Sequence, residues 1–155
     1  MRWVKALIGV VIILLIVVQV IKPARTNPSI DPRREIFSNL SVDAQVGATL
    51  ARSCNDCHSN RTVWPWYSHI APVSWLIVSD VNRGRKALNF SEWGNYGTKE
   101  QREHLADICN EVTEGEMPSF SYTLMHRGAS LSKAEVATVC GWTRTLSQGS
   151  MAEGQ

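Results

Sequence analysis

The sequence predicts an all-α protein, and three observations lead to this prediction. No stretch of the 155 residues alternates apolar and polar side chains over the length of a strand. Several stretches instead repeat apolar side chains along one helix face, and two of them begin with a Ser/Thr-x-x-Glu/Gln capping sequence. An apolar segment near the N-terminus predicts one further helix. The length suits one small domain with an appendage.

The apolar segment runs from Ala6 to Ile21 and contains one polar residue, Gln19. As a helix it would reach about 24 Å at ~1.5 Å per residue, and Lys5 and Lys22 could extend to the two interfaces of a bilayer. We therefore expect residues 1–22 to form a transmembrane anchor. The alternative is a cleaved signal peptide, although no small-x-small cleavage site follows.

Residues 23–31 carry two prolines and few large apolar side chains, so we expect residues 23–41 to be a tether. A helix is expected over residues 42–53, where Val42, Val46 and Leu50 recur at steps of four, and it runs directly into Cys54. The folded domain is expected to cover residues 42–148, followed by a flexible tail over 149–155.

The sequence Cys54-Asn55-Asp56-Cys57-His58 has the form C-x-x-C-H, which is typical of covalent haem attachment. Each thiol can bond a vinyl group of haem, and the adjacent histidine can bind the iron as proximal ligand. Redox pairs and zinc sites also use C-x-x-C, but no βαβ pattern precedes Cys54 and no second ligand pair has zinc-site spacing. The motif predicts one covalently bound haem c, held by Cys54, Cys57 and His58.

Covalent haem attachment takes place outside the bacterial cytoplasm, so the motif and the apolar segment predict the same location. We expect a single-pass protein of the cell membrane with its haem domain on the periplasmic side. The formal charge is +2; without Arg2, Lys5 and Lys22, Lys plus Arg falls from 16 to 13 against 14 Asp plus Glu. This near-neutral domain gives no support for nucleic-acid binding.

Three further helices are expected after the motif, over residues 73–83, from 98 to 114 and from 132 onward. The capping sequence Thr98–Gln101 opens the second, which ends before Gly115, and Ser132–Glu135 opens the third. Cys109 and Cys140 lie on the apolar faces of these two helices. They could form a disulfide or remain as buried thiols.

The sixth ligand of the iron would decide the function, and five residues are candidates: Met117, Met125, His69, His104 and His126. We expect Met117, because Pro118 biases it to an extended backbone and stiffens the loop. His126 is the second choice. His104 is expected to be exposed among charged residues, and His69 follows His58 too closely to reach the opposite face without a tight wrap.

Arginine guanidinium, indole N–H and phenol O–H groups can donate hydrogen bonds to haem propionates. Six residues between positions 61 and 85 are candidates for this role or for the haem pocket: Arg61, Trp64, Trp66, Tyr67, Arg83 and Arg85.

A helix ending in C-x-x-C-H, a Met-Pro loop and a final amphipathic helix form a layout that resembles class I cytochromes c. The resemblance implies a cytochrome c-like small helical domain with an axial Met117. It implies that the first and last helices cross with a small residue facing an aromatic one, here Gly47 and Trp142. It also implies that a proline carbonyl accepts the proximal imidazole N–H, with Pro72 as first choice and Pro65 second.

Between Cys54 and Glu135 the chain is similar to the bacterial haem-binding domain family, whose members are small exported proteins, often with one N-terminal membrane anchor. The matching segments begin at Cys54, Trp64 (Trp-Pro-Trp-Tyr-Ser), Ala71 (Ala-Pro-Val-Ser-Trp), Gly84 (Gly-Arg-Lys-Ala-Leu-Asn-Phe-Ser-Glu-Trp), Met117 (Met-Pro) and Ala129 (Ala-Ser-Leu-Ser-Lys-Ala-Glu). The family often has Met-Pro-Pro, whereas Ser119 follows Pro118 here. The resemblance implies one covalently bound haem and leaves the physiological role open.

These observations predict a membrane-anchored monohaem cytochrome that passes single electrons to a redox partner protein outside the cytoplasm. A haem with two protein ligands transfers electrons and resists small molecules. The alternative is a haem-based sensor or ligand-binding module with an open or labile sixth site. An enzyme such as a peroxidase ranks last, because no distal His–Arg or paired-carboxylate arrangement can be recognised.

Overall fold

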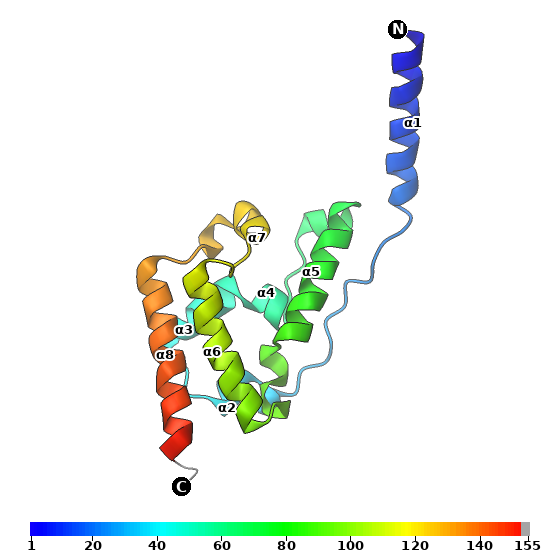
Figure 1. Ribbon diagram of the computed structural model, residues 1–155. Coiled ribbons are helices and arrows are strands. Elements are labelled where there is room, and N and C mark those ends of the chain that lie inside the picture. The colour runs from blue at the N-terminus through cyan, green and yellow to red at the C-terminus, as the bar shows by residue number, and fades with distance from the viewer. Residues whose placement is uncertain (153–155) are drawn as a thin grey trace.

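The computed structural model describes the backbone of residues 1–152 and the side chains of residues 1–148. Over that range every regular element is a helix, so the predicted all-α class is confirmed. The α-helices are α1 (Arg2–Val18), α2 (Ile36–Asn39), α3 (Ala44–Ser53), α4 (Asn55–His58), α5 (Val73–Ala87), α6 (Thr98–Glu114), α7 (Phe120–Met125) and α8 (Lys133–Ala152). Short 3-10 helices are η1 (Pro32–Arg34), η2 (Trp66–His69), η3 (Phe90–Asn95) and η4 (Arg127–Ala129). Figure 1 shows α2 to α8 gathered together, with α1 standing apart.

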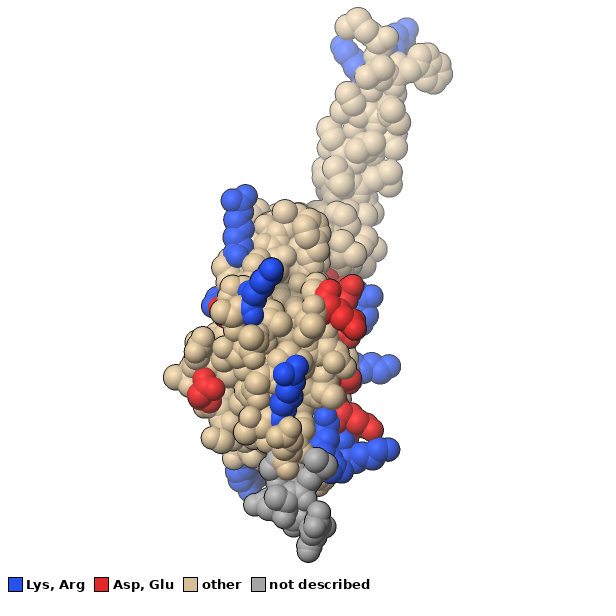
Figure 2. All heavy atoms as spheres, turned by 60° about the vertical axis from the view of Figure 1, so that its left-hand side comes forward, with Lys and Arg blue, Asp and Glu red and all other residues tan. Residues whose placement is uncertain are grey.

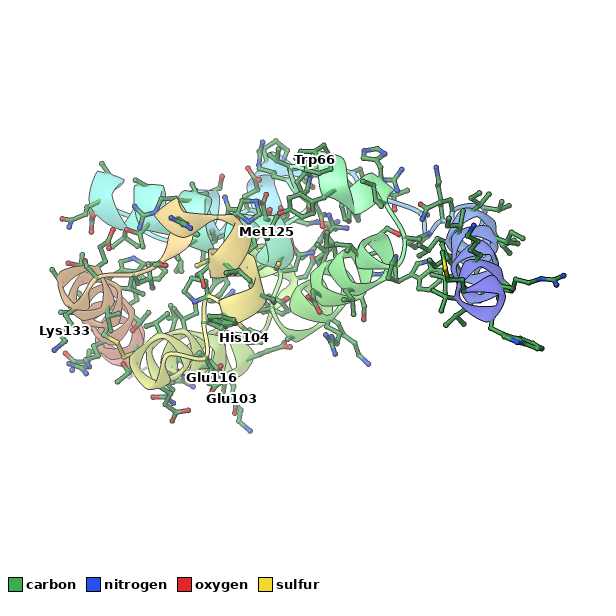
Figure 3. All side chains as sticks on the ribbon, turned by 90° about the horizontal axis from the view of Figure 1, so that it is seen from above. Trp66, Glu103, His104, Glu116, Met125 and Lys133 are labelled. Atoms are coloured by element: carbon green, nitrogen blue, oxygen red, sulfur yellow. A yellow bond between two sulfur atoms is a disulfide. The ribbon has the colours of Figure 1, made fainter. Side chains whose placement is uncertain are left out.

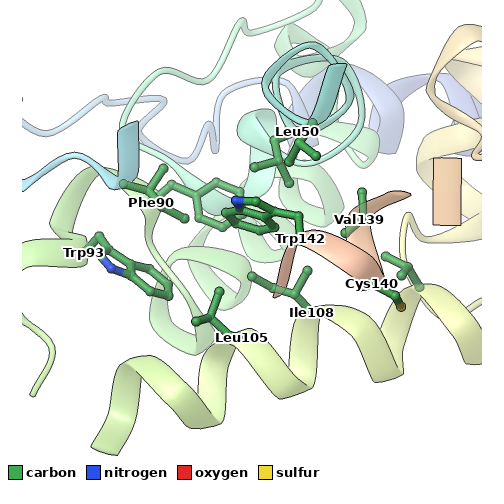
Figure 4. Close-up of a cluster of buried hydrophobic side chains, with 11 residues drawn as sticks. Leu50, Phe90, Trp93, Leu105, Ile108, Val139, Cys140 and Trp142 are labelled. Carbon is green, nitrogen blue, oxygen red and sulfur yellow. The ribbon is translucent and has the colours of Figure 1, made fainter. Parts of the chain in front are cut away.

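Helices α6 and α8 lie side by side along one side of the domain (Figure 1). Their apolar faces meet, so Ile108 of α6 and Trp142 of α8 are buried in the same cluster. Leu50 of α3 completes this part of the core, and Figure 4 shows the Trp142 ring with Leu50 on one side and Ile108 on the other. Burial of a side chain such as Leu50 contributes about 1.5–3 kcal/mol. The core therefore anchors α3, the helix that leads into Cys54.

A disulfide joins α6 to α8 between Cys109 and Cys140. Of the two states that the sequence left open for these residues, the structure has the bridge. It closes a loop with a sequence separation of 31 residues, which includes the whole Met117 segment and α7. Both ends of that loop are thereby tied to the core.

The two expected capping sequences behave differently. Ser132 and Glu135 form the predicted box at the start of α8: the Ser132 N–H donates to Glu135 Oε2 at 2.8 Å, and the Glu135 N–H donates to Ser132 Oγ at 3.3 Å. At α6 the box is absent, and the N-cap is Gly97. The Gln101 side chain turns back to donate to the Trp93 and Tyr96 carbonyls. These carbonyls lie at the end of η3, so tertiary packing displaced the local cap.

The segment expected to be a tether is bound to the domain. Asn27 donates to the Thr62 carbonyl at 2.9 Å and accepts from Arg85 at 2.8 Å, and Arg25 donates to the Ser68 carbonyl. Farther along, Ile36 is fully buried in the core. The folded domain therefore includes residues before position 42, because Ile36 supplies apolar surface that the core requires.

Helix α1 is largely exposed, and on the face seen in Figure 2 it carries charge only near its N-terminal end. It is 17 residues long, about 26 Å at ~1.5 Å per residue, whereas the hydrocarbon core of a bilayer is ~30 Å thick. Within residues 1–152 no helix combines the length and the apolar character that crossing a membrane requires. The predictions of a transmembrane helix in residues 1–22 and of a single-pass protein of the cell membrane are therefore wrong.

Two further expectations need correction. Helix α8 continues to Ala152, so residues 149–152 are not a tail, while residues 153–155 lie outside the described residues. Gly47 does not pair with Trp142: a Cβ at position 47 would lie nearest to Phe37 and Val42. The Trp142 indole instead donates to the Ser41 carbonyl at 3.0 Å. Helix α8 packs mainly on α6, to which the disulfide ties it.

Candidate functional site

The C-x-x-C-H sequence lies at a break between two helices. Helix α3 ends at Ser53, the backbone of Cys54 leaves the helical region (φ −126°, ψ −37°), and α4 begins at the next residue. Both thiols of the motif are free and half-buried. Cys54, Cys57 and His58 all line one cavity of about 400 Å³. The break in the helix therefore brings two thiols and an imidazole to one space.

Helix α5 closes another side of this cavity through Gly84 and Ala87. Gly84 lies against the backbone of Cys57, where a Cβ would be only 2.5 Å from the carbonyl oxygen. A glycine inside a helix often marks a close approach of two backbones. The two helices can pack at this distance because residue 84 has no side chain.

His58 is oriented by the end of α5. Its Nδ1–H donates to the Leu88 carbonyl at 3.1 Å, which leaves the Nε2 lone pair available to a metal. Burial lowers the pKa of His58, so the imidazole is neutral at neutral pH, as a ligand must be. The expected acceptor was the carbonyl of Pro72 or Pro65. Pro72 instead caps the far end of α5, sixteen residues before Leu88 in the numbering, and so it lies away from His58.

Both thiols of the motif are held in the neutral form. Burial is the main cause that raises the pKa of Cys54 to about 12 and that of Cys57 to about 11. Reactive redox cysteines have lowered pKa values, so the pair does not resemble a thioredoxin-type site. Among the described residues no three His, Cys, Asp or Glu side chains are grouped as a metal site. The donor set thus disfavours a zinc site.

Met117 lines the same cavity as His58, together with Pro118. Gly115 caps the C-terminal end of α6, as predicted, and its φ of 78° is the left-handed conformation that glycine adopts at little cost. The chain then turns back, and the Met117 N–H donates to the Glu111 carbonyl at 3.2 Å. The Met117 side chain is 38% exposed, so it is not a packed core residue. A thioether and an imidazole therefore face the same space.

His126 lies at an adjoining cavity of about 290 Å³, which shares Cys57, Asp80 and Tyr122 with the first. Its Nδ1–H donates to the Tyr122 carbonyl at 3.1 Å, so its Nε2 accepts from the Tyr67 hydroxyl at 3.2 Å. Both ring nitrogens are engaged. This favours Met117 over His126 as the group that is available to a metal.

The other two histidines and Met125 are placed differently. His69 is exposed at the end of η2, and neither cavity includes it. The prediction that His104 is exposed is wrong. Its side chain is only 15% exposed and packs on Tyr96, with the two ring centroids 4.6 Å apart. Met125 lines the adjoining cavity beside His126. None of these residues lines the cavity that holds His58 and both thiols of the motif.

The structure separates the candidate pocket residues into two groups. Arg83 lines the main cavity, where it pairs with Asp80, and Tyr67 lines the adjoining one. The others are engaged or exposed elsewhere: Arg61 binds Glu35, Arg85 binds the Ser59 carbonyl, Trp64 donates to Asn27, Trp66 is 74% exposed and Pro72 caps α5. Of the three arginines, Arg83 is the one placed to meet a ligand in the main cavity.

Several residues of the site were not predicted. Leu88 contributes a main-chain carbonyl, which carries no signal in the side-chain sequence. Tyr122 donates to Asp56 at 2.8 Å across 66 residues of sequence, a pairing that no local pattern indicates. Gly84 is the first residue of the family segment Gly-Arg-Lys-Ala-Leu-Asn-Phe-Ser-Glu-Trp. A glycine inside a helix is a signal of close packing between backbones, and this signal could have identified it.

The side chains fit a covalently held haem. Two free thiols, an imidazole with an available nitrogen and a thioether line one cavity. The wall of that cavity also contains the hydroxyl of Ser53, which is buried and has no hydrogen-bond partner among the described residues. A buried polar group of this kind is usually satisfied by a bound molecule or ordered water.

Comparison with known proteins supports haem binding. No curated protein matches the chain, and no solved structure does so. A family model described as a haem-binding domain matches residues 13–145, which include the whole C-x-x-C-H sequence, α5 and the Met117 loop. The chain therefore belongs to the haem-binding domain family.

Proposed function

We propose that this protein is a monohaem c-type cytochrome that carries single electrons to a redox partner protein and does not act as an enzyme. The observation that carries the proposal is the common cavity of Cys54, Cys57, His58 and Met117. The thiols would hold the haem covalently, and His58 and Met117 would be the axial ligands. When bound, haem supplies a one-electron couple whose potential is raised by His/Met ligation.

The chain's own groups support that role. The Leu88 carbonyl holds the His58 ring in the tautomer that presents Nε2 to the cavity. Arg83, now paired with Asp80, would donate to a haem propionate, because a guanidinium binds carboxylates in a forked geometry. The adjoining cavity is lined mostly by apolar side chains, among them Val73, Leu76 and Met125, and it would exclude water from one face of the macrocycle.

Covalent attachment is tested on the full chain produced with haem-attachment machinery. The denatured protein should retain haem through gel electrophoresis and mass spectrometry, with a mass increase of one haem. Replacement of both Cys54 and Cys57 by alanine should abolish this retention. Haem that dissociates from the denatured wild-type protein would contradict the c-type assignment.

Axial ligation is tested by absorption spectra of the oxidised and reduced protein. Met117→Ala should remove the methionine-to-iron charge-transfer band of the oxidised form and lower the reduction potential. Met125→Ala is the matched control, because Met125 is 56% exposed and lines the adjoining cavity instead. A wild-type protein that lacks the band and binds carbon monoxide rapidly in the ferrous state would favour the sensor alternative.

A further inference from the structure

Helix α7 borders the haem cavity but has little apolar packing of its own. None of its six residues counts as buried within the described chain, and Phe120 and Leu124 are 80% and 61% exposed. Figure 3 shows Met125 on α7, near the middle of the domain. The segment Met117–Ser119 leads directly into α7. Whatever holds α7 in place therefore also limits where the Met117 side chain can lie.

A hydrogen bond fastens α7 to the C-x-x-C-H sequence. The Tyr122 hydroxyl donates to Asp56 Oδ2 at 2.8 Å. The other carboxylate oxygen, Oδ1, accepts the Val63 N–H at 2.9 Å, so the acceptor is itself fixed by the backbone. Asp56 precedes Cys57 directly. The contact thus joins the segment that carries the proximal ligand to the helix that follows Met117.

A second phenol makes a weaker contact in the same region. The Tyr67 hydroxyl donates to Nε2 of the His126 ring at 3.2 Å, just beyond the end of α7. A hydrogen bond to a charged carboxylate is about twice as strong as one between neutral groups, so the Tyr122 contact is the stronger of the two. Burial, and next the bond to Asp56, raises the pKa of Tyr122, so its hydroxyl stays protonated and remains a donor.

We propose that Tyr122 is a positioning residue: by donating to Asp56 inside the haem-attachment sequence, it holds α7, and through α7 the Met117 side chain, over the haem cavity. The inference rests on the Met117 ligation proposed above. It assigns Asp56, a variable position of C-x-x-C-H, a role on the Met117 side of the haem. Residues 54–58 would then both attach the haem and restrain Met117, the ligand that carbon monoxide can displace.

The test compares Tyr122→Phe with Tyr67→Phe in the full-length haem-loaded protein. Tyr122→Phe keeps the ring and its stacking on His126 at 4.2 Å and removes one O–H group. It should weaken the methionine-to-iron band and raise the rate of carbon monoxide binding to the ferrous protein roughly tenfold. Tyr67→Phe should change that rate by about threefold or less, since its lost bond is about half as strong as the bond to Asp56. A Tyr122→Phe protein with the wild-type band and binding rate would overturn the proposal.

A third measurement separates this inference from the ligation on which it rests. If the wild-type protein lacks the methionine band, Met117 ligation fails, and amide hydrogen exchange over residues 119–125 decides the role of Tyr122. Faster exchange there in Tyr122→Phe supports the restraint of α7, and unchanged exchange refutes it. Asp56→Asn replaces the charged acceptor with a neutral amide and should have a smaller effect in the same direction, and the double variant should add little to Tyr122→Phe. Additive effects would show that Tyr122 does not act through Asp56.

Discussion

The carbonyl oxygen of Cys57 lies where a side chain at position 84 would begin: a Cβ built on Gly84 would be 2.5 Å from that oxygen and 3.0 Å from the Cys57 Cβ. Gly84 lies in the last turn of α5, which ends at Ala87, and Leu88 is the next residue. Because the Leu88 carbonyl accepts from His58, the close contact at Gly84 also sets the distance between His58 and its hydrogen-bond partner.

Replacement of Gly84 by alanine should therefore separate α4 from α5. We expect a loss of about 1–3 kcal/mol in the free energy of unfolding, because the new methyl group meets backbone atoms that cannot rotate away. Urea denaturation measures this loss, and the fraction of protein that carries haem should fall as well. Gly141→Ala is the control: that position on α8 has open space around it and should gain up to about 1 kcal/mol from better helix propensity. Equal midpoints for the two variants would contradict the packing argument.

The disulfide between Cys109 and Cys140 should stabilise the domain mainly by restricting the unfolded chain. With a sequence separation of 31 residues, we expect its removal to cost about 3–4 kcal/mol. The double variant Cys109→Ala, Cys140→Ala should show this in urea denaturation. Wild-type protein treated with a reductant should unfold at a similar midpoint. An unchanged midpoint after verified reduction would show that the bridge adds no stability.

Stability should fall in acid through Glu135, the N3 residue of the capping box. Hydrogen bonds from the Ser132 backbone, then the Arg52 and Ser132 side chains, lower its pKa from 4.5 to about 2. Because the folded state favours the ionised form of Glu135, this carboxylate contributes its full stabilisation above pH 4.5. The contribution is lost as the pH falls toward 2 and the carboxylate is protonated. Glu135→Gln should make the pH dependence of the urea midpoint shallower in that window. Glu103→Gln, which removes the same charge from the exposed side of α6, serves as the control.

Arg85 should hold the segment before η1 against the domain. Its guanidinium donates to the carbonyls of Ser59 and Thr26 and to the side chains of Asn27 and Thr62. A lysine has no forked donor group, so Arg85→Lys should lose most of these bonds, at a cost of about 2 kcal/mol. Amide exchange over residues 25–29 should increase. Lys86→Ala, at an exposed neighbouring position, should leave that exchange unchanged.

Elements with a strong local signal were predictable. The Ser132–Glu135 box and the left-handed Gly115 depend on residues within one turn of the chain, and the structure has both. The Thr98–Gln101 box failed, although its sequence is similar, because Gln101 found the carbonyls that end η3. Burial of Ile36 was missed for a related reason, since its neighbours in the sequence resemble those of a linker.

The sequence by itself determined the chemistry: two thiols and an imidazole within five residues, a Met-Pro after a helix end, and apolar spacing that makes helices. The tertiary structure decided which of these groups meet. It brought Met117 to the cavity of His58, engaged His126 with Tyr67, gave His58 the Leu88 carbonyl and joined Tyr122 to Asp56. Local patterns report on residues within one or two turns, whereas these contacts join residues 30 to 66 positions apart and depend on how the helices pack.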